Sequence, residues 1–227
     1  MLLEKKMTQK EYRKVNFWPW VGPEYEEGFN GHRLLVLGES HYCHIKCKEC
    51  NAEACMKQGY SEEDFHNQTI EVIDGYLHAY EGERFQQTFL CFERAVLGKT
   101  ASDEEQEAFW NHLAFYNYVQ NDLHKETGSR TNLGSADSAA SKEAFREILE
   151  TLKPDKVIVW GKRLYRKLPP DWGGSESEIK TENGCTPVWT YTINGKEIPC
   201  MAVHHPSTPS GKDRNYWHPF YEAFLNQ

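Results

Sequence analysis

The chain has 227 residues, of which 39% are hydrophobic and 13% aromatic, enough for one α/β domain with a full core. Its formal net charge of -8 argues against a broad nucleic-acid surface, although a local basic patch can coexist with an acidic remainder. Residues 1–14 carry charges where a signal peptide needs an apolar stretch, and no run approaches the ~20 apolar residues of a membrane span, so we expect a cytoplasmic protein without a membrane partner.

The first third of the chain predicts an arm and then a buried strand. Residues 17–31, FWPWVGPEYEEGFNG, have no steady period and predict an ordered N-terminal arm, within about 1–31, that lays aromatic side chains on the core. Leu34 to Leu37 form an all-apolar run of the kind found in parallel strands buried on both faces. A turn begins at Gly38, and the polar loop after it lies where ligands bind in open α/β sheets.

The middle of the chain predicts helices on either side of a second strand. Capping boxes begin at Ser61 and Ser102, and residues 61–98 and 102–113 have helical periodicity. Residues 114–120, AFYNYVQ, are a strand candidate, and the polar stretch that follows is a loop long enough to be a candidate for function.

The last third predicts two helices, a buried strand and a hairpin. Residues 141–152 form an amphipathic helix, and KVIVWG at 156–161 reads as a buried strand. Two further strands flank Asn194 and Gly195, a strong hairpin signal, and residues 216–225 can close the chain as a helix. The alternation of strands and helices predicts a single three-layer α/β/α domain over residues 1–227, with a central, mostly parallel sheet.

Three predicted strands end in unusual polar sequences: GESHY at 38–42, FYNYVQND at 115–122 and HHPSTPS at 204–210. Together they resemble motifs of the uracil-DNA glycosylase superfamily, over about residues 34–210. HPSTPS is similar to the best-known branch, which carries HPS, two residues and Ser, while Gly38 and Glu39 are similar to the first motif of the iron–sulfur branch. The chain departs from the pattern at Ser40, where the best-known branch has a water-activating aspartate, and at His41, where both branches have proline.

The resemblance implies a site that cleaves the N-glycosidic bond of uracil or a related base in DNA. Such a reaction needs a carboxylate or an activated water beside the sugar and a donor at the base oxygen. Glu39 is the candidate to orient or deprotonate water, a neutral His205 the candidate donor, and the Asn117 amide suits the uracil edge. The expected substrate-binding residues are Gly38, Ser40, His41, Tyr42, Asn117, Ser207 and Ser210, with Lys212 and Arg214 as local positive charge.

Several of these side chains also have a structural interpretation. Glu39 can cap the turn that follows it, and Asn117 can be a buried amide that satisfies a neighbouring loop. His204 is expected to be structural, because strand alternation points it away from the His205 face.

Four cysteines follow the first motif, Cys43, Cys47, Cys50 and Cys55, within a Cys-rich loop at 43–55. Four thiols so close together can converge on a zinc ion or a [4Fe–4S] cluster, and His41 or His44 can replace a thiol. An odd total of seven cysteines in a cytoplasmic protein argues against a disulfide framework. Cys91, Cys185 and Cys200 are interpreted as ordinary buried cysteines.

Three functional hypotheses stay open at this level. The first is a glycosylase-like enzyme whose partner is single- or double-stranded DNA or another nucleobase-containing ligand, acting as a monomer. The second keeps the fold but treats Ser40 and His41 as marks of an altered site in a nucleic-acid- or nucleotide-binding protein. The third is a radical-SAM-like cluster enzyme, since the spacing of the first three cysteines matches that triplet, although the βαβ rhythm disfavours it.

Overall fold

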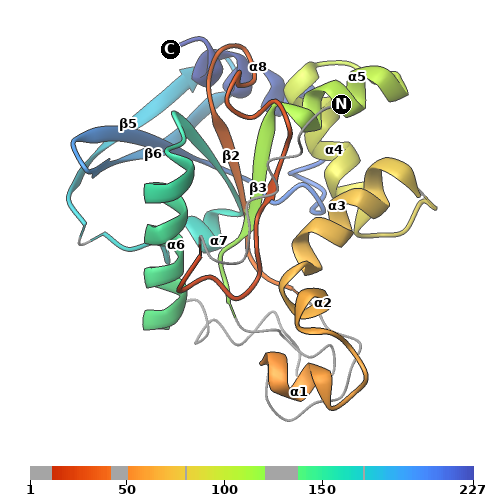
Figure 1. The fold of residues 1–227 in the computed structure, drawn as a ribbon. Helices are drawn as coiled ribbons and strands as arrows, with labels where there is room; N and C mark the ends of the chain where they lie inside the picture. The colour runs from red at the N-terminus through yellow and green to blue at the C-terminus, as the bar shows by residue number, and fades with distance from the viewer. Residues whose placement is uncertain (1–11, 42–50, 80, 121–137, 171) are drawn as a thin grey trace.

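A computed structural model describes residues 12–41, 51–79, 81–120, 138–170 and 172–227 (Figure 1). The strands are β1 Trp20–Val21, β2 Leu34–Gly38, β3 Leu113–Asn117, β4 Lys156–Trp160, β5 Gly174–Thr181, β6 Gly184–Ile193 and β7 Lys196–Val203. The helices are α1 Ala52–Met56, α2 Glu62–His66, α3 Gln68–His78, α4 Gln86–Leu97, α5 Asp103–Asn111, α6 Ala139–Leu152, α7 Lys162–Tyr165 and α8 Arg214–Leu225. None of these helices is long and apolar enough to cross a membrane.

The described residues form a single α/β domain around one mixed sheet, with strand order β1-β3-β2-β4-β7-β6-β5. The four strands β3, β2, β4 and β7 run parallel to one another, whereas β1 at one edge and the β7-β6-β5 meander at the other pair antiparallel. The sheet is therefore parallel at its centre and antiparallel toward both edges. Since parallel strands need crossover connections, the helices lie against the faces of the sheet.

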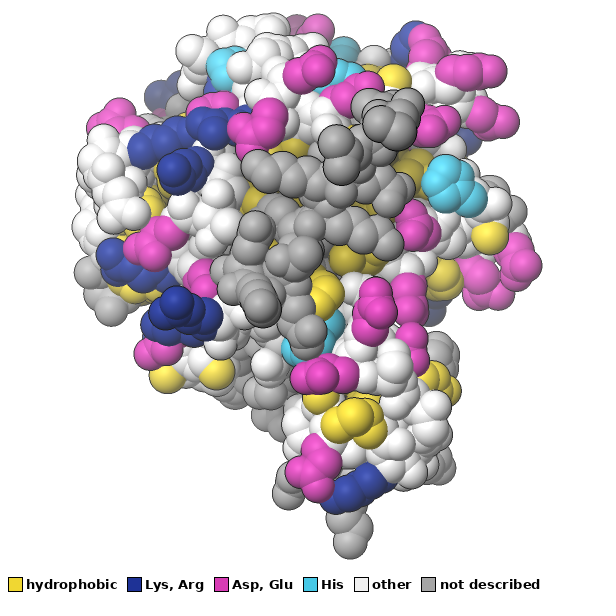
Figure 2. Space-filling view, in the orientation of Figure 1, with side chains coloured by type: hydrophobic (Ala, Val, Ile, Leu, Met, Phe, Trp, Pro, Cys, Tyr) yellow, Lys and Arg dark blue, Asp and Glu magenta, His cyan; other side chains and the backbone are white. Residues whose placement is uncertain are grey.

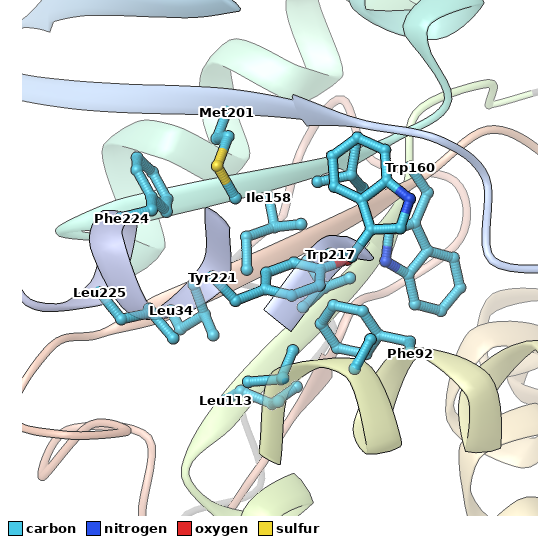
Figure 3. Packing of buried hydrophobic residues seen from close by; sticks show 14 of the residues in the cluster. Leu34, Phe92, Leu113, Ile158, Trp160, Met201, Trp217, Tyr221, Phe224 and Leu225 are labelled. Carbon is cyan, nitrogen blue, oxygen red and sulfur yellow. The ribbon is translucent and has the colours of Figure 1, made fainter. Parts of the chain in front are cut away.

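Helices cover both faces of the sheet (Figure 1). Alternate residues of the central strands belong to two separate hydrophobic clusters, one on each face. On one face Val36, Phe115 and Ile158 belong to a cluster with side chains of α3, α4, α5 and α8. Figure 3 shows Ile158 of this cluster with Phe92 of α4 and Tyr221 of α8. On the other, Leu35 and Val157 pack with α6 and the N-terminal arm. The central strands are buried on both faces, which explains why their sequences read as continuous apolar runs rather than as alternating ones.

The local predictions hold best where a sequence signal is short and self-contained. Both capping boxes, at Ser61 and Ser102, are present. The β6–β7 hairpin turns through Asn194 and Gly195, both with positive φ. The strands at Leu34–Gly38 and Lys156–Trp160 and the amphipathic α6 are confirmed.

The predicted helical stretch at 61–98 is divided into three helices, with a reversal between α3 and α4. Gln86 holds this reversal together from a buried position: its Nε2 donates to the carbonyls of Gly75 and Ala79, each at 3.1 Å, and its Oε1 accepts from the N–H groups of Glu81 and Glu83. The Gly75 carbonyl also accepts from the Ala79 N–H, whereas the Ala79 carbonyl lies just beyond α3, so one amide side chain ties the end of α3 to the start of α4. This long-range cap is invisible to a periodicity argument.

Other boundaries also differ from the predictions. The helix expected through residue 113 ends at Asn111, and β3 begins at Leu113. β5 was not predicted, because seven of its eight side chains are not buried and its sequence, GSESEIKT, lacks apolar alternation. The edge position explains this composition, since exposed edge strands carry polar residues.

The N-terminal arm packs on the core as expected, with Phe17 and Tyr25 buried. Gln120, just beyond β3, anchors it: its Oε1 accepts from the N–H groups of Asn16 and Phe17 at 2.7 and 3.0 Å, and its Nε2 donates to the Asn117 carbonyl at 2.9 Å. The arm is therefore tied to the carboxyl end of β3.

Candidate functional site

The carboxyl ends of β3, β2, β4 and β7 lie next to one another at one edge of the sheet. Gly38 at the end of β2 pairs in register with Asn117 at the end of β3, and Trp160 at the end of β4 pairs with Val203 at the end of β7. The segments that carry the three sequence motifs therefore leave the sheet on the same side, at the carboxyl ends of its parallel strands. This is where open α/β proteins bind ligands.

Asn117 and Gly38 are in direct contact across the two strands. A Cβ added at Gly38 would lie 2.2 Å from the Asn117 Oδ1 and 2.8 Å from the Phe115 Cζ, so no larger residue fits without moving the amide. Asn117 is half-buried. Glycine at position 38 is thus explained by the close approach of the Asn117 side chain, which lies across the end of β2.

His205 is held by the turn that follows it. Its Nδ1 accepts from the Ser207 backbone N–H at 3.2 Å and lies 2.8 Å from the Ser207 Oγ. Because a backbone N–H only donates, Nδ1 is an acceptor, and the proton of a neutral His205 is on Nε2. The Thr208 N–H and hydroxyl both donate to the His205 carbonyl. A Cβ at Gly211 would lie 2.0 Å from that carbonyl oxygen, so the turn is tight.

An aromatic wall connects these two parts of the site. The Trp160 ring lies 5.9 Å from the His205 ring in an edge-to-face arrangement and 5.0 Å from the Phe115 ring. Phe89 of α4 packs against both Trp160 and Phe115. These packed rings thus extend from His205 to Phe115, which lies next to Gly38, and they make an apolar surface at the carboxyl ends of the strands.

Glu39 forms an ion pair with Arg163 that the sequence interpretation missed. The Arg163 Nε donates to the Glu39 Oε2 at 3.3 Å, and its Nη2 donates to Oε1, so two edges of the planar groups face each other. The Glu39 side chain is 14% exposed and that of Arg163 is 39% exposed. The only sequence signal for this pair is the position of Lys162 and Arg163 directly after a buried strand.

His41 lies in a different environment from Gly38 and Asn117. It is buried, its ring centroid is 4.5 Å from that of Phe17, and its Nε2 is 3.2 Å from the Thr69 Oγ1. Burial lowers the pKa of His41 to about 3, which keeps it neutral near pH 7. Cys55 is buried in the same region, in a small cluster with Phe17 and Phe65. These two predicted site residues are brought together by the arm.

The serines of the last motif differ in exposure. Ser207 is half-buried beside His205, whereas Ser210 is exposed and its carbonyl accepts from the Trp217 Nε1 at 2.8 Å. Ser40 is half-buried. His204 packs its ring 5.1 Å from that of Trp217, and burial, together with the charge of Lys162, lowers its pKa, in keeping with a structural role.

Part of the predicted site lies outside the described residues: Tyr42, Cys43, His44, Cys47 and Cys50. Within the described ranges, no three potential metal-ligating side chains of the His, Cys, Asp or Glu type come together. Of the cysteines interpreted as buried, Cys200 is buried and Cys91 half-buried, but Cys185 is exposed. The prediction for Cys185 was wrong because it sits on β6 opposite the exposed edge strand β5.

Comparison with models of known protein families gives no match, and comparison with curated proteins finds no relative.

Proposed function

We propose that the protein is an N-glycosyl hydrolase that removes uracil or a related base from DNA, similar to the uracil-DNA glycosylase superfamily. One observation carries the proposal: three residues with suitable chemistry lie at the carboxyl ends of the parallel strands. They are Asn117 at the end of β3, Gly38 beside it at the end of β2, and His205 after β7, whose Nδ1 accepts from the Ser207 N–H. Donor and acceptor groups for a base thus come from the ends of separate strands.

The chemistry assigned to His205 is electrostatic. As the glycosidic bond breaks, negative charge develops on the departing base, and a preorganised N–H donor stabilises it. The Ser207 N–H occupies Nδ1, so the Nε2–H of a neutral His205 is the donor. Asn117 offers one acceptor and two donors, which match the mixed edge of uracil in a base that has been flipped out of the stack.

The role that we propose for Glu39 is to orient a water molecule beside the sugar. Both of its oxygens accept from Arg163, which compensates its charge, but a carboxylate has about four lone-pair sites and can accept further hydrogen bonds. We therefore assign Glu39 to orienting water and stabilising positive charge on the sugar, rather than to abstracting a proton.

The uneven distribution of charge fits a nucleic-acid partner. In Figure 2 most Asp and Glu side chains lie on the side of α3 and α5, whereas Lys and Arg gather on the side of α6. A net charge of -8 is therefore compatible with a local surface that attracts phosphates.

A second candidate function is binding of a nucleic acid or nucleotide without cleavage. Two features favour it: Ser40 replaces the aspartate of the best-known branch, and the carboxylate of Glu39 is engaged by Arg163. A site of this kind would retain Asn117 and His205 as base-recognition groups.

The metal proposal concerns Cys43, Cys47, Cys50 and Cys55 as ligands of zinc or a [4Fe–4S] cluster. Its role would be to fix the loop beyond Gly38 before substrate arrives. Elemental analysis and visible absorbance of the purified protein distinguish the two metals, and a metal-free protein that binds neither ion would contradict the proposal.

The test of the function is base release from a labelled single-stranded oligonucleotide that contains uracil, read as alkali-labile abasic sites. His205→Ala is expected to reduce the rate at least ~100-fold, because one oxyanion donor contributes that much. His78→Ala, at an exposed position in α3, is the matched control and should retain the wild-type rate. Tight binding of the oligonucleotide with no base release by the wild type would favour the second candidate function.

A further inference from the structure

We propose that Arg163 is the positioning residue for Glu39, holding its carboxylate in a single orientation just beyond the carboxyl end of β2. This inference rests on the proposed function. Nε and Nη2 of Arg163 contact the two oxygens of Glu39, although the two residues are 124 positions apart in the sequence.

Burial explains why Glu39 needs such a partner. With only 14% of its side chain exposed, the carboxylate has lost most of its water, and a buried charge is tolerated only when it is paired and hydrogen-bonded. A guanidinium matches a carboxylate in a planar, bidentate geometry, which fixes direction as well as distance. A lysine would supply the positive charge, but it lacks the planar pair of N–H donors that fixes the orientation of the carboxylate.

The topology makes Arg163 a rigid support. β4 lies beside β2 in the sheet, and α7 starts two residues after β4 ends. Leu164 anchors α7 in the core, and the Gly161 N–H donates to the Val203 carbonyl at 2.9 Å. Gly161 has φ of 103°, a conformation that favours glycine and turns the chain sharply into α7.

The Arg163–Glu39 pair also reduces the repulsion between the Glu39 carboxylate and the phosphates of DNA. An unpaired carboxylate beside the bound DNA would repel its phosphates, whereas a carboxylate whose charge is compensated by a guanidinium does so far less. Arg163 thus allows Glu39 to approach the sugar of an anionic substrate, while the remaining lone pairs of Glu39 orient water.

The experiment is single-turnover base release from the uracil oligonucleotide by wild type, Arg163→Met, Arg163→Lys, Glu39→Gln and the Glu39→Gln/Arg163→Met double variant. Arg163→Met is expected to lower the single-turnover rate constant at saturating enzyme about 10- to 100-fold, with the half-saturating enzyme concentration changed less than about threefold, since a small misplacement of a reacting group costs that much. Arg163→Lys should recover part of the loss. Urea unfolding of each variant checks that the fold is intact.

The double variant separates positioning from a general structural role. If Arg163 acts through Glu39, adding Arg163→Met to Glu39→Gln lowers the rate no further, because the two residues work as one unit. Lys99→Met is the matched control: Lys99 also pairs with a glutamate, Glu105, but both side chains are exposed on the acidic side of the molecule at α5, and its removal should leave the rate unchanged.

The outcomes are distinct. The positioning role is overturned if Arg163→Met is as active as wild type. It is also overturned if Arg163→Met lowers the rate by the same factor in wild type and in Glu39→Gln. In both cases the proposed function still stands. Absence of base release by the wild type overturns the proposed function and this inference with it.

Discussion

Glu93 offers the sharpest test of the packing behind the candidate site. This residue of α4 is 1% exposed, and a single oxygen, Oε2, accepts from three donors: the Tyr76 hydroxyl at 2.9 Å, the Gln106 Nε2 at 3.0 Å and the Trp110 Nε1 at 3.2 Å. The three donors come from α3 and α5. Glu93 therefore joins these helices to α4, behind the aromatic wall that contains Phe89.

Replacing Glu93 with leucine removes the acceptor and leaves the donors. Tyr76 and Trp110 are fully buried, whereas Gln106 is half-buried and can turn toward water. An unsatisfied buried donor costs about 1–3 kcal/mol, so two cost roughly 2–6 kcal/mol. Removing a carboxylate that is itself poorly solvated offsets part of this, and we expect a net loss of about 2–4 kcal/mol in the free energy of unfolding.

Glu93→Gln separates the hydrogen bonds from the charge, since its carbonyl oxygen can accept from the same donors. Burial raises the pKa of Glu93, an effect that the hydrogen bonds from Tyr76, Gln106 and Trp110 partly offset. For an acid with a raised folded-state pKa, the folded state binds more protons, so stability falls as pH rises through that range. We therefore expect Glu93→Gln to gain stability relative to wild type between about pH 4 and pH 7.

The assay is urea unfolding followed by tryptophan fluorescence at both pH values, with Glu107→Leu on the exposed surface of α5 as control. The control should change stability by less than about 0.5 kcal/mol. A Glu93→Leu protein within about 1 kcal/mol of wild type would refute the reasoning, because the donors would then have found other partners.

Two further predictions concern Gly38 and His41. Gly38→Ala should destabilise the protein by about 1–3 kcal/mol and reduce base release, because the added Cβ would lie 2.2 Å from the Asn117 Oδ1. Urea unfolding and the oligonucleotide assay check this expectation. If stability and base release were both unchanged, the Asn117 amide would have to move away freely. His41, with a folded-state pKa of about 3 against about 6.5 when unfolded, binds its proton mainly in the unfolded state, so stability should fall as pH decreases from about 6.5 toward 3, with a slope of up to about 1.4 kcal/mol per pH unit. His41→Phe should flatten this dependence, and an unaltered pH profile would place the acid sensitivity elsewhere.

The sequence by itself determined the elements whose signals are local. The apolar runs of β2 and β4, the capping boxes at Ser61 and Ser102 and the turn at Asn194 each depend on a few neighbouring residues, and all were predictable. It also indicated which polar segments leave the carboxyl ends of strands, because a buried strand followed by a glycine and polar residues is a local pattern.

Only the tertiary structure decided which of these residues meet. The contact of Asn117 with Gly38 depends on β2 and β3 pairing in parallel, and the contact of Arg163 with Glu39 depends on β4 taking the other side of β2. The burial of His41 depends on Phe17 of the arm. Crossover connections bring the two strand-end pairs together from 79 and 124 positions apart, and the arm folds back on His41 from 24 positions away; no periodicity or spacing along the chain encodes these contacts.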